Sequence, residues 1–238
     1  MCENWLYISK NRSCDTQKSK CNFGLSAGTI KPAAPIRRKT IMAAVHNEDI
    51  RDLLSSIPII PDNLMIQYLM RRFNMSENRA RETIYQACRQ YRHMKPVCYS
   101  LKGSIARSEN VTMNSNLLSL CKALRVACEY LPGSRQFVVS KVFPWILTFY
   151  DNGYVYHVCE FNRGEELLKA EVIRSAGIAR EMLPVTTRIC ILGPGTNQNL
   201  IQACGMRYFC TVDTNTWDLD VLSAVPDEEV WKGMPVYD

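Results

Sequence analysis

The spacing of apolar residues divides the chain into a helical stretch and a stretch in which strands and helices alternate. From about residue 47, leucines and isoleucines recur at intervals of three and four, the spacing of one face of an α-helix. Later runs of β-branched and aromatic residues alternate with segments of helical spacing. We therefore expect an α+β protein with a helical module at residues 45–110 and a linker helix plus small α/β layer at residues 111–225.

Three short helices are expected in the first module. The first begins near Asn47, the second covers Leu64 to Phe73, and the third runs from Glu77 to about Arg92, with Ser76 as its N-cap. Only three residues separate the last two helices. This is the spacing of a helix-turn-helix unit.

Two short runs of β-forming residues follow the third helix. They cover residues 97–99 and 104–106, and Lys102-Gly103 lies between them as a turn signal. Such a hairpin after a helix-turn-helix is the wing of a winged helix. The pattern therefore predicts an N-terminal winged helix-turn-helix domain.

The second module opens with an amphipathic helix that begins at Asn114 or Ser115 and joins the two modules. The β-rich runs around Asn152-Gly153 predict a hairpin, because a type I′ turn needs positive φ at both central residues. A helix with acidic residues at its start follows, and then strand and helix signals alternate up to residue 212. This alternation predicts parallel pairing at the crossovers.

Positive charge is distributed unevenly along the 238 residues, whose formal net charge is +6. Residues 1–41 hold eight Lys or Arg and two acids, residues 51–110 hold ten and five, and residues 111–238 hold eleven and fourteen. This asymmetry indicates two modules with different partners. Residues 1–41 lack periodicity, and we expect either a disordered basic extension or sequence upstream of a start at Met42. Residues 226–238 are expected to form a tail.

The eleven cysteines form no CxxC pair, and most of them lie in apolar segments, where a free thiol packs as a small hydrophobic group. This usage favours neither a disulfide framework nor a zinc ribbon, and we expect a reducing, cytoplasmic location. No apolar run is long enough to span a bilayer, and the N-terminus lacks a signal-peptide pattern. No membrane partner is expected.

The third helix carries the candidate DNA-contacting side chains. Polar residues recur at intervals of three and four on the side opposite its expected core face, which includes Ala80, Ile84 and Ala87. Arginine can bind guanine and asparagine can bind adenine in the major groove, while other basic groups hold phosphate. The candidate residues are Arg71, Arg72, Asn78, Arg79, Arg81, Tyr85, Arg89, Arg92 and Lys102. The alternative is a protein–protein adaptor whose helical module docks on a partner.

A third and less favoured function is a metal-dependent nuclease, in which two carboxylates share Mg²⁺. In the expected hairpin Asp151 pairs with Tyr154, and Glu160 lies about 20 Å away at about 3.3 Å per residue. Trp145 is expected opposite Glu160, and Asn162 stands where a catalytic lysine would be needed. The sequence therefore predicts no catalytic residues in this layer.

No cofactor or metal site is predicted either. The segment ILGPGTNQNL has glycines between a strand and a helix but lacks the Gly-Lys-Ser/Thr of a phosphate loop. His46, His93 and His157 are far apart in sequence. The acids of residues 211–231 lack the spacing of a calcium loop, and we expect a solvated tail there.

The order of a winged helix-turn-helix, a linker helix and FPWILTFYDNGYVYHVCEFNRGEE before an α/β unit resembles the replication-relaxation group. Related uncharacterised proteins of Firmicutes plasmids and conjugative elements are similar. The resemblance covers roughly residues 45–225 and implies a degenerate restriction-endonuclease-like layer without enzyme activity. It also implies a DNA-binding protein of a mobile genetic element, acting in replication, transfer or transcriptional regulation. Its partners would be double-stranded DNA, a replication or conjugation protein, or a second copy of the chain. The matching recognition-helix positions are Asn78, Arg81, Tyr85 and Arg89, with Arg79 nearby.

Overall fold

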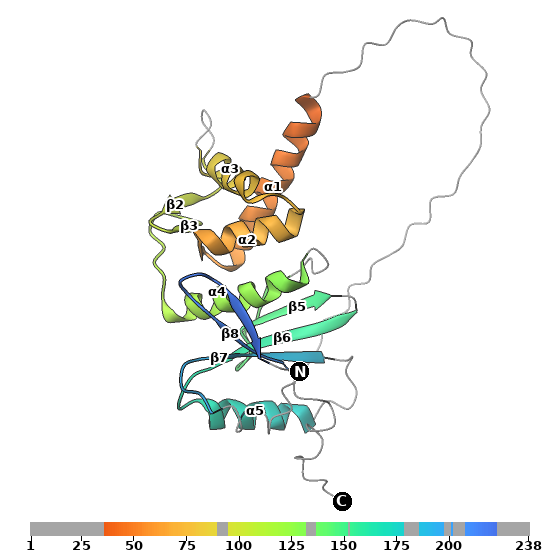
Figure 1. Ribbon diagram of the computed structural model, residues 1–238, viewed down its shortest axis with the longest axis vertical. Coiled ribbons are helices and arrows are strands. Elements are labelled where there is room, and N and C mark those ends of the chain that lie inside the picture. Colours follow the sequence, from red (N-terminus) through yellow and green to blue (C-terminus); the bar gives the residue numbers. More distant parts are fainter. Residues whose placement is uncertain are drawn as a thin grey trace, which may run out of the picture. The chain divides into compact units, whose positions relative to one another are not determined.

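The fold combines helices with two β-sheets, as the α+β expectation requires (Figure 1). The computed structural model describes residues 36–89, 95–131, 137–151, 153–178, 186–197, 201 and 208–222. All of these except Ile36 belong to one compact unit, Arg37–Asp238. The N-terminal residues 1–35, Arg92 and the expected tail at 226–238 lie outside the described residues.

The first part of this unit consists of three helices and a small antiparallel sheet. In chain order its elements are α1 (Ile36–Ser56), β1 (Ile59–Pro61), α2 (Asp62–Phe73), α3 (Glu77–Cys88), β2 (Tyr99–Leu101) and β3 (Ser104–Ala106). The strand order is β1-β3-β2, and β3 runs antiparallel to both neighbours. The expected hairpin around Lys102-Gly103 is confirmed, although its first strand covers Tyr99–Leu101 and not residues 97–99. Gly103 has the positive φ of +74° that its turn requires.

Several boundaries differ from the expected ones. Helix α1 begins at Ile36 and not near Asn47, so it includes the last residues of the segment that was expected to be disordered. Helix α3 ends at Cys88, before Arg92, because Arg89 is already extended, with ψ of 130°. Strand β1 was not expected, since Pro58 before it and Pro61 at its end indicated only a break. Its isoleucines are nevertheless buried and pair with β3.

The second part is a six-stranded sheet with helices on both faces. Its elements are α4 (Ser115–Ala127), the 3₁₀-helix η1 (Cys128–Tyr130), β4 (Phe137–Val139), β5 (Leu147–Asp151), β6 (Tyr154–Phe161), α5 (Glu166–Ile178), β7 (Thr186–Leu192), β8 (Tyr208–Val212) and β9 (Leu219–Leu222). The strands lie in sequence order. The β5–β6 hairpin is antiparallel, and β6, β7 and β8 are parallel, as the sequence predicted.

Helix α4 lies between the first three helices and the sheet (Figure 1). It contributes to two hydrophobic cores through opposite faces. Cys121 and Leu124 pack with the helices of the first part. Ala123 and Val126 pack with the sheet, against Val158 of β6. The small residues on the sheet side allow close approach of helix and strands. Helix α4 therefore packs against both parts of this unit.

Strand β9 and the turn before it correct the expectation of a solvated tail after residue 211. Strand β9 pairs with β8, and Trp217 in the preceding turn is only 3% exposed. Its side chain belongs to the core formed by α1, α2 and α3. The burial of the Trp217 side chain therefore outweighs the preference of the neighbouring acids for solvent, because burying a large apolar group stabilises the turn by about 2–3 kcal/mol.

An ion-pair network around the buried Arg125 reinforces this junction. Arg125 on α4 is 6% exposed and donates from Nε to the carbonyl oxygen of Trp217 at 2.6 Å. Glu129 accepts hydrogen bonds from Arg125 at 2.5 Å and from Arg71 of α2 at 2.6 Å. Burial opposes the ionisation of Glu129, but these two guanidinium groups outweigh it and hold its pKa below the ordinary value.

The helices within the described ranges are short or interrupted by polar residues. None of them has both the length and the apolar content needed to cross a bilayer.

Replacing Glu129 tests the network. We expect Glu129→Gln to lower the free energy of unfolding by about 2 kcal/mol at neutral pH, because Arg125 then has no anionic partner. The folded pKa of Glu129 is lowered, so its contribution is complete above the unfolded pKa, near 4.5, and disappears as the pH falls through the folded pKa. Urea denaturation at successive pH values should show the two proteins converging in acid. A constant difference at all pH values would contradict the pairing.

Candidate nucleic-acid interface

The outward face of α3 carries the side chains that the sequence pattern selects. Its exposed members are Asn78, Arg79, Arg81 and Tyr85, and Tyr85 is 61% exposed. The buried residues on the opposite face are Ala80, Thr83, Ile84 and Ala87. The 3.6-residue period of the helix separates these two sets, so the direction of the predicted polar face is confirmed.

Arg89 lies just beyond the last helical residue and still belongs to this face. Its guanidinium carbon is 5.3 Å from the centre of the Tyr85 ring. A guanidinium over an aromatic face is held in place, while its N–H groups in the plane can still bind phosphate or a base edge. The two residues thus form a preorganised pair on the protein surface.

Arg81 is paired within the helix. Its guanidinium lies 2.7 Å from Glu77, one turn earlier, and both side chains are 55% exposed. An exposed pair of this kind contributes less than about 1 kcal/mol. Arg81 can therefore exchange Glu77 for a phosphate or a base at small cost.

Arg71 and Arg72 have internal partners. Arg71 binds Glu129, and Arg72 lies 3.2 Å from Asp49, which also accepts a hydrogen bond from the Tyr68 hydroxyl. The Arg72 side chain is only 18% exposed. Both arginines hold α2 against its neighbours, so a phosphate would have to replace carboxylates that are already in place.

The hairpin turn lies close to the start of α2. Asp62 donates its backbone N–H to the carbonyl oxygen of Gly103 at 3.1 Å. Burial raises the pKa of Asp62, and the positive charge of Arg81 opposes this rise, which places Arg81 near the same point. Lys102, the exposed residue before Gly103, therefore lies next to the start of α2.

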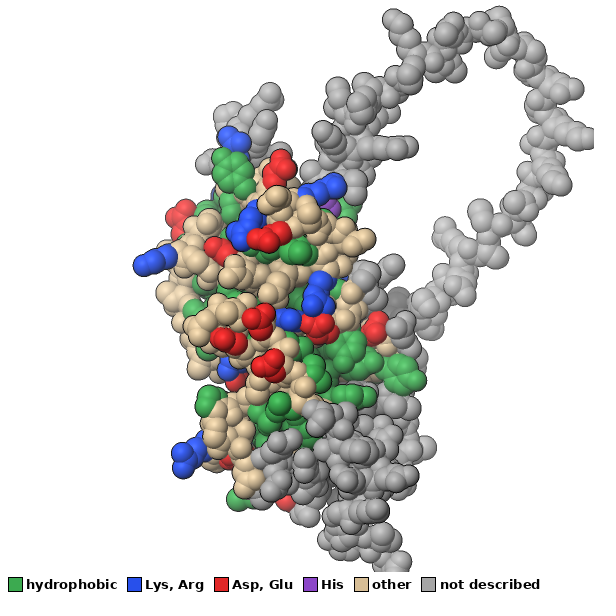
Figure 2. All heavy atoms as spheres, viewed as in Figure 1, with side chains coloured by type: hydrophobic (Ala, Val, Ile, Leu, Met, Phe, Trp, Pro, Cys, Tyr) green, Lys and Arg blue, Asp and Glu red, His purple; other side chains and the backbone are tan. Residues whose placement is uncertain are grey.

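The charges over this region are mixed. Among the described residues, no carboxylate lies within 4.0 Å of the charged groups of Arg79, Arg89 or Lys102. Figure 2 shows basic side chains interleaved with acidic ones over the helical part of the molecule. The candidate interface thus consists of a small number of basic groups on one helix and one turn, and the described residues form no continuous basic surface on the face drawn in Figure 2.

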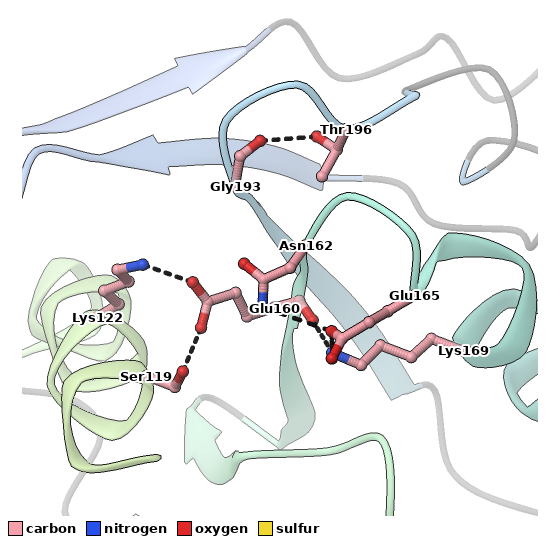
Figure 3. A network of polar contacts seen from close by, with 8 residues as sticks. All are labelled: Ser119, Lys122, Glu160, Asn162, Glu165, Lys169, Gly193 and Thr196. Carbon is pink, nitrogen blue, oxygen red and sulfur yellow. Dashed lines mark hydrogen bonds and ion pairs between the residues drawn. The ribbon is translucent and has the colours of Figure 1, made fainter. Parts of the chain in front are cut away.

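The sheet contains the second polar cluster, centred on Glu160 of β6 (Figure 3). Glu160 is 2% exposed, accepts a hydrogen bond from Lys122 of α4 at 2.5 Å and is also bound by the Ser119 hydroxyl. Lys169 of α5 donates to the backbone oxygen of Glu160 at 2.7 Å and to Glu165 at 2.6 Å. The buried carboxylate is therefore neutralised by a lysine from the joining helix.

The register of the hairpin is the one that the sequence predicts. Asp151 pairs with Tyr154 at one end of β6, and Glu160 lies toward the other end. Trp145 and Glu160 line one cavity of about 430 Å³, and Asn162 hydrogen-bonds to Glu165 there. Within the described residues, no three His, Cys, Asp or Glu side chains gather in a way that could hold a metal ion.

Lys122 and Ser119 were not identified from the sequence as partners of Glu160. The available signal was their position, because they are polar residues three apart and therefore lie on one side of a largely apolar helix. Their contacts span 38 and 41 residues, and no local pattern predicts which strand position they meet.

A double-mutant cycle tests whether the Lys122–Glu160 ion pair stabilises the fold. We expect Lys122→Met to destabilise the fold by about 3 kcal/mol, because it leaves Glu160 buried without a cation. Adding Glu160→Gln should restore most of that stability, since the uncompensated charge is then removed. Urea denaturation of all four proteins measures the coupling. If the effects of the two substitutions are additive, the proposed pairing is wrong.

Comparisons with known proteins provide no further assignment of this site. A scan against protein-family models found no matching family, and a search of curated proteins found no matching sequence. A fold alone does not determine a function, because one architecture can carry unrelated sites. The features of this chain that bear on its function are therefore the exposed face of α3 and the neutralised Glu160.

Proposed function

We propose that this chain is a non-enzymatic protein that binds double-stranded DNA by placing α3 in the major groove. The observation that carries the proposal is the outward face of α3, where Asn78, Arg81 and Tyr85 project while Ala80 and Ile84 anchor the helix. The order helix, strand, two helices and hairpin supports a winged helix-turn-helix, in which the helix after the turn is the recognition helix.

Each side chain has a distinct role in this proposal. Asn78 and Arg81 lie in the first turns of α3, and these are the positions from which a recognition helix reaches base edges. Arginine matches the two acceptors of guanine, and asparagine matches the donor and acceptor of adenine. Arg79, Arg89 and Lys102 bind phosphates and fix the position of the helix on the duplex.

The sheet serves association in this proposal. Its buried Glu160 is neutralised by Lys122, which supports a degenerate, inactive relative of a restriction-endonuclease-like layer. Both edge strands carry an exposed valine, Val138 on β4 and Val221 on β9. Such edges support self-association or docking of a replication or conjugation protein. The proposed setting is the cytoplasm, in the service of a mobile genetic element, as the resemblance to replication-relaxation proteins implies.

A protein–protein adaptor is the second candidate. It is favoured by Tyr85, which is 61% exposed and stacks with Arg89, because tyrosine and arginine dominate the binding energy of many protein interfaces. An adaptor would show no duplex affinity at low salt, whereas a DNA-binding protein would bind any duplex weakly through phosphates.

Removing both arginines of the α3 face tests the proposal. We expect Arg81→Ala plus Arg89→Ala to weaken duplex binding by about 5- to 150-fold for each specific base or phosphate contact that is removed. Fluorescence anisotropy with a labelled duplex measures the affinity. Arg163→Ala is the matched control, because Arg163 is an exposed arginine on the sheet side of the chain and its removal should leave the affinity nearly unchanged. Equal binding by the double variant and the wild type would remove the assignment of α3.

Lys102 and Asn78 should affect binding in different ways. We expect Lys102→Ala to weaken binding to all duplexes alike and to reduce the slope of log affinity against log salt by about 1, because one phosphate is no longer neutralised. Asn78→Ala should leave that slope unchanged and relax the preference for one base pair in a selected duplex. Titrations at several salt concentrations check both outcomes, and an unchanged slope for Lys102→Ala would exclude a phosphate contact by the hairpin.

A further inference from the structure

Two thiols meet where the end of α3 approaches the start of β2. Cys88 is the last residue of α3, Cys98 immediately precedes β2, and their sulfur atoms are 3.4 Å apart. The backbone N–H of Val97 donates to the carbonyl oxygen of Ala87 at 2.9 Å, next to both cysteines. The main chain therefore keeps the two sulfurs close together.

The two thiols differ in access to solvent. Cys88 is half-buried, whereas Cys98 is 0% exposed. Other described thiols have different partners, since those of Cys121 and Cys159 donate to backbone carbonyl oxygens. A reagent from solvent can thus reach Cys88 first. Cys98 is then the thiol that is placed to react with the modified Cys88 sulfur.

The hydrogen bond between the thiols makes them chemically unequal. It lowers the pKa of Cys88, although burial and the nearby Asp62 oppose this effect. The same contact and burial raise the pKa of Cys98. Since the thiolate is the nucleophile in thiol–disulfide exchange, Cys88 is the attacking residue.

We propose that Cys88 and Cys98 form a reversible disulfide with a small-molecule disulfide, such as oxidised glutathione, as the oxidant. The Cys88 thiolate attacks one sulfur of the oxidant and releases one small thiolate. Cys98 then loses its proton and attacks the Cys88 sulfur, which releases the second small thiolate. The protein gives up two electrons and two protons, and the oxidant becomes two thiols. The sulfurs need to approach by about 1.4 Å to reach bonding distance.

The bond would join the end of α3 to the hairpin. Arg89 follows Cys88 directly and already has an extended conformation. The Cys88 sulfur can therefore move toward Cys98 without breaking the earlier helical turns of α3. The disulfide depends only on the two thiols and does not require the proposed function. In a reducing compartment such a bond is transient and senses the redox state.

Peptide mapping of the wild-type full-length chain tests the proposal. The folded protein is equilibrated in buffers of increasing oxidised-to-reduced glutathione ratio, free thiols are alkylated at low pH, and digested peptides are analysed by mass spectrometry. We expect a peptide pair joined through Cys88 and Cys98, lighter by two hydrogen atoms, that disappears again when reduced glutathione is restored. The melting temperature of the oxidised chain should rise by about 5 °C, because the bond restricts the unfolded chain.

Two single variants separate this bond from general oxidation. Cys98→Ser should stop the reaction at a mixed disulfide between Cys88 and glutathione, whereas Cys121→Ser removes another buried thiol of the same core and should leave the bond intact. If either variant fails to fold, the wild-type mapping alone decides. The proposal is overturned if Cys88 remains a free thiol in fully oxidised glutathione, or if it pairs with a cysteine other than Cys98.

Discussion

The packing of α4 against two cores is the interaction on which the arrangement depends. A helix with a single apolar face would leave either the first three helices or the sheet without cover. Leu124 fills the helical core and Val126 fills the sheet core, so neither part can separate from α4 without exposing apolar surface. Arg125 and Lys122 add charged contacts at the same helix, one to the turn at Trp217 and one to Glu160.

Features that depend on neighbouring residues could be predicted from the sequence, whereas features that depend on distant partners could not. Local periodicity predicts the direction of the α3 face, and turn chemistry predicts the turn at Lys102-Gly103 and the β5–β6 hairpin. The structure reproduces these three features. Strand β1 and the burial of Trp217 depend on partners far along the chain. Arg125 and Trp217, for example, are separated by 92 residues. Local patterns carry no information about such pairs, so these features were found only in the structure.

The same distinction applies to the polar residues. A helical period assigns Asn78, Arg81 and Tyr85 to the surface, but it does not show that Arg81 already pairs with Glu77. Cysteines in apolar segments were expected to act as hydrophobic groups, and most of the described ones are buried. The contact between Cys88 and Cys98 depends on the path of the chain between α3 and β2, which spacing alone does not reveal.

The proposed division of roles gives α3 and the hairpin turn the contact with DNA, while the sheet holds a neutralised carboxylate. The most direct test is nuclear magnetic resonance of the isotope-labelled chain during titration with a short duplex. We predict that amide signals from α3 and from the Lys102 turn shift together and in proportion to duplex added, while those of β5 and β6 remain in place. Shifts confined to the sheet, or no shifts at low salt, would contradict DNA binding by α3.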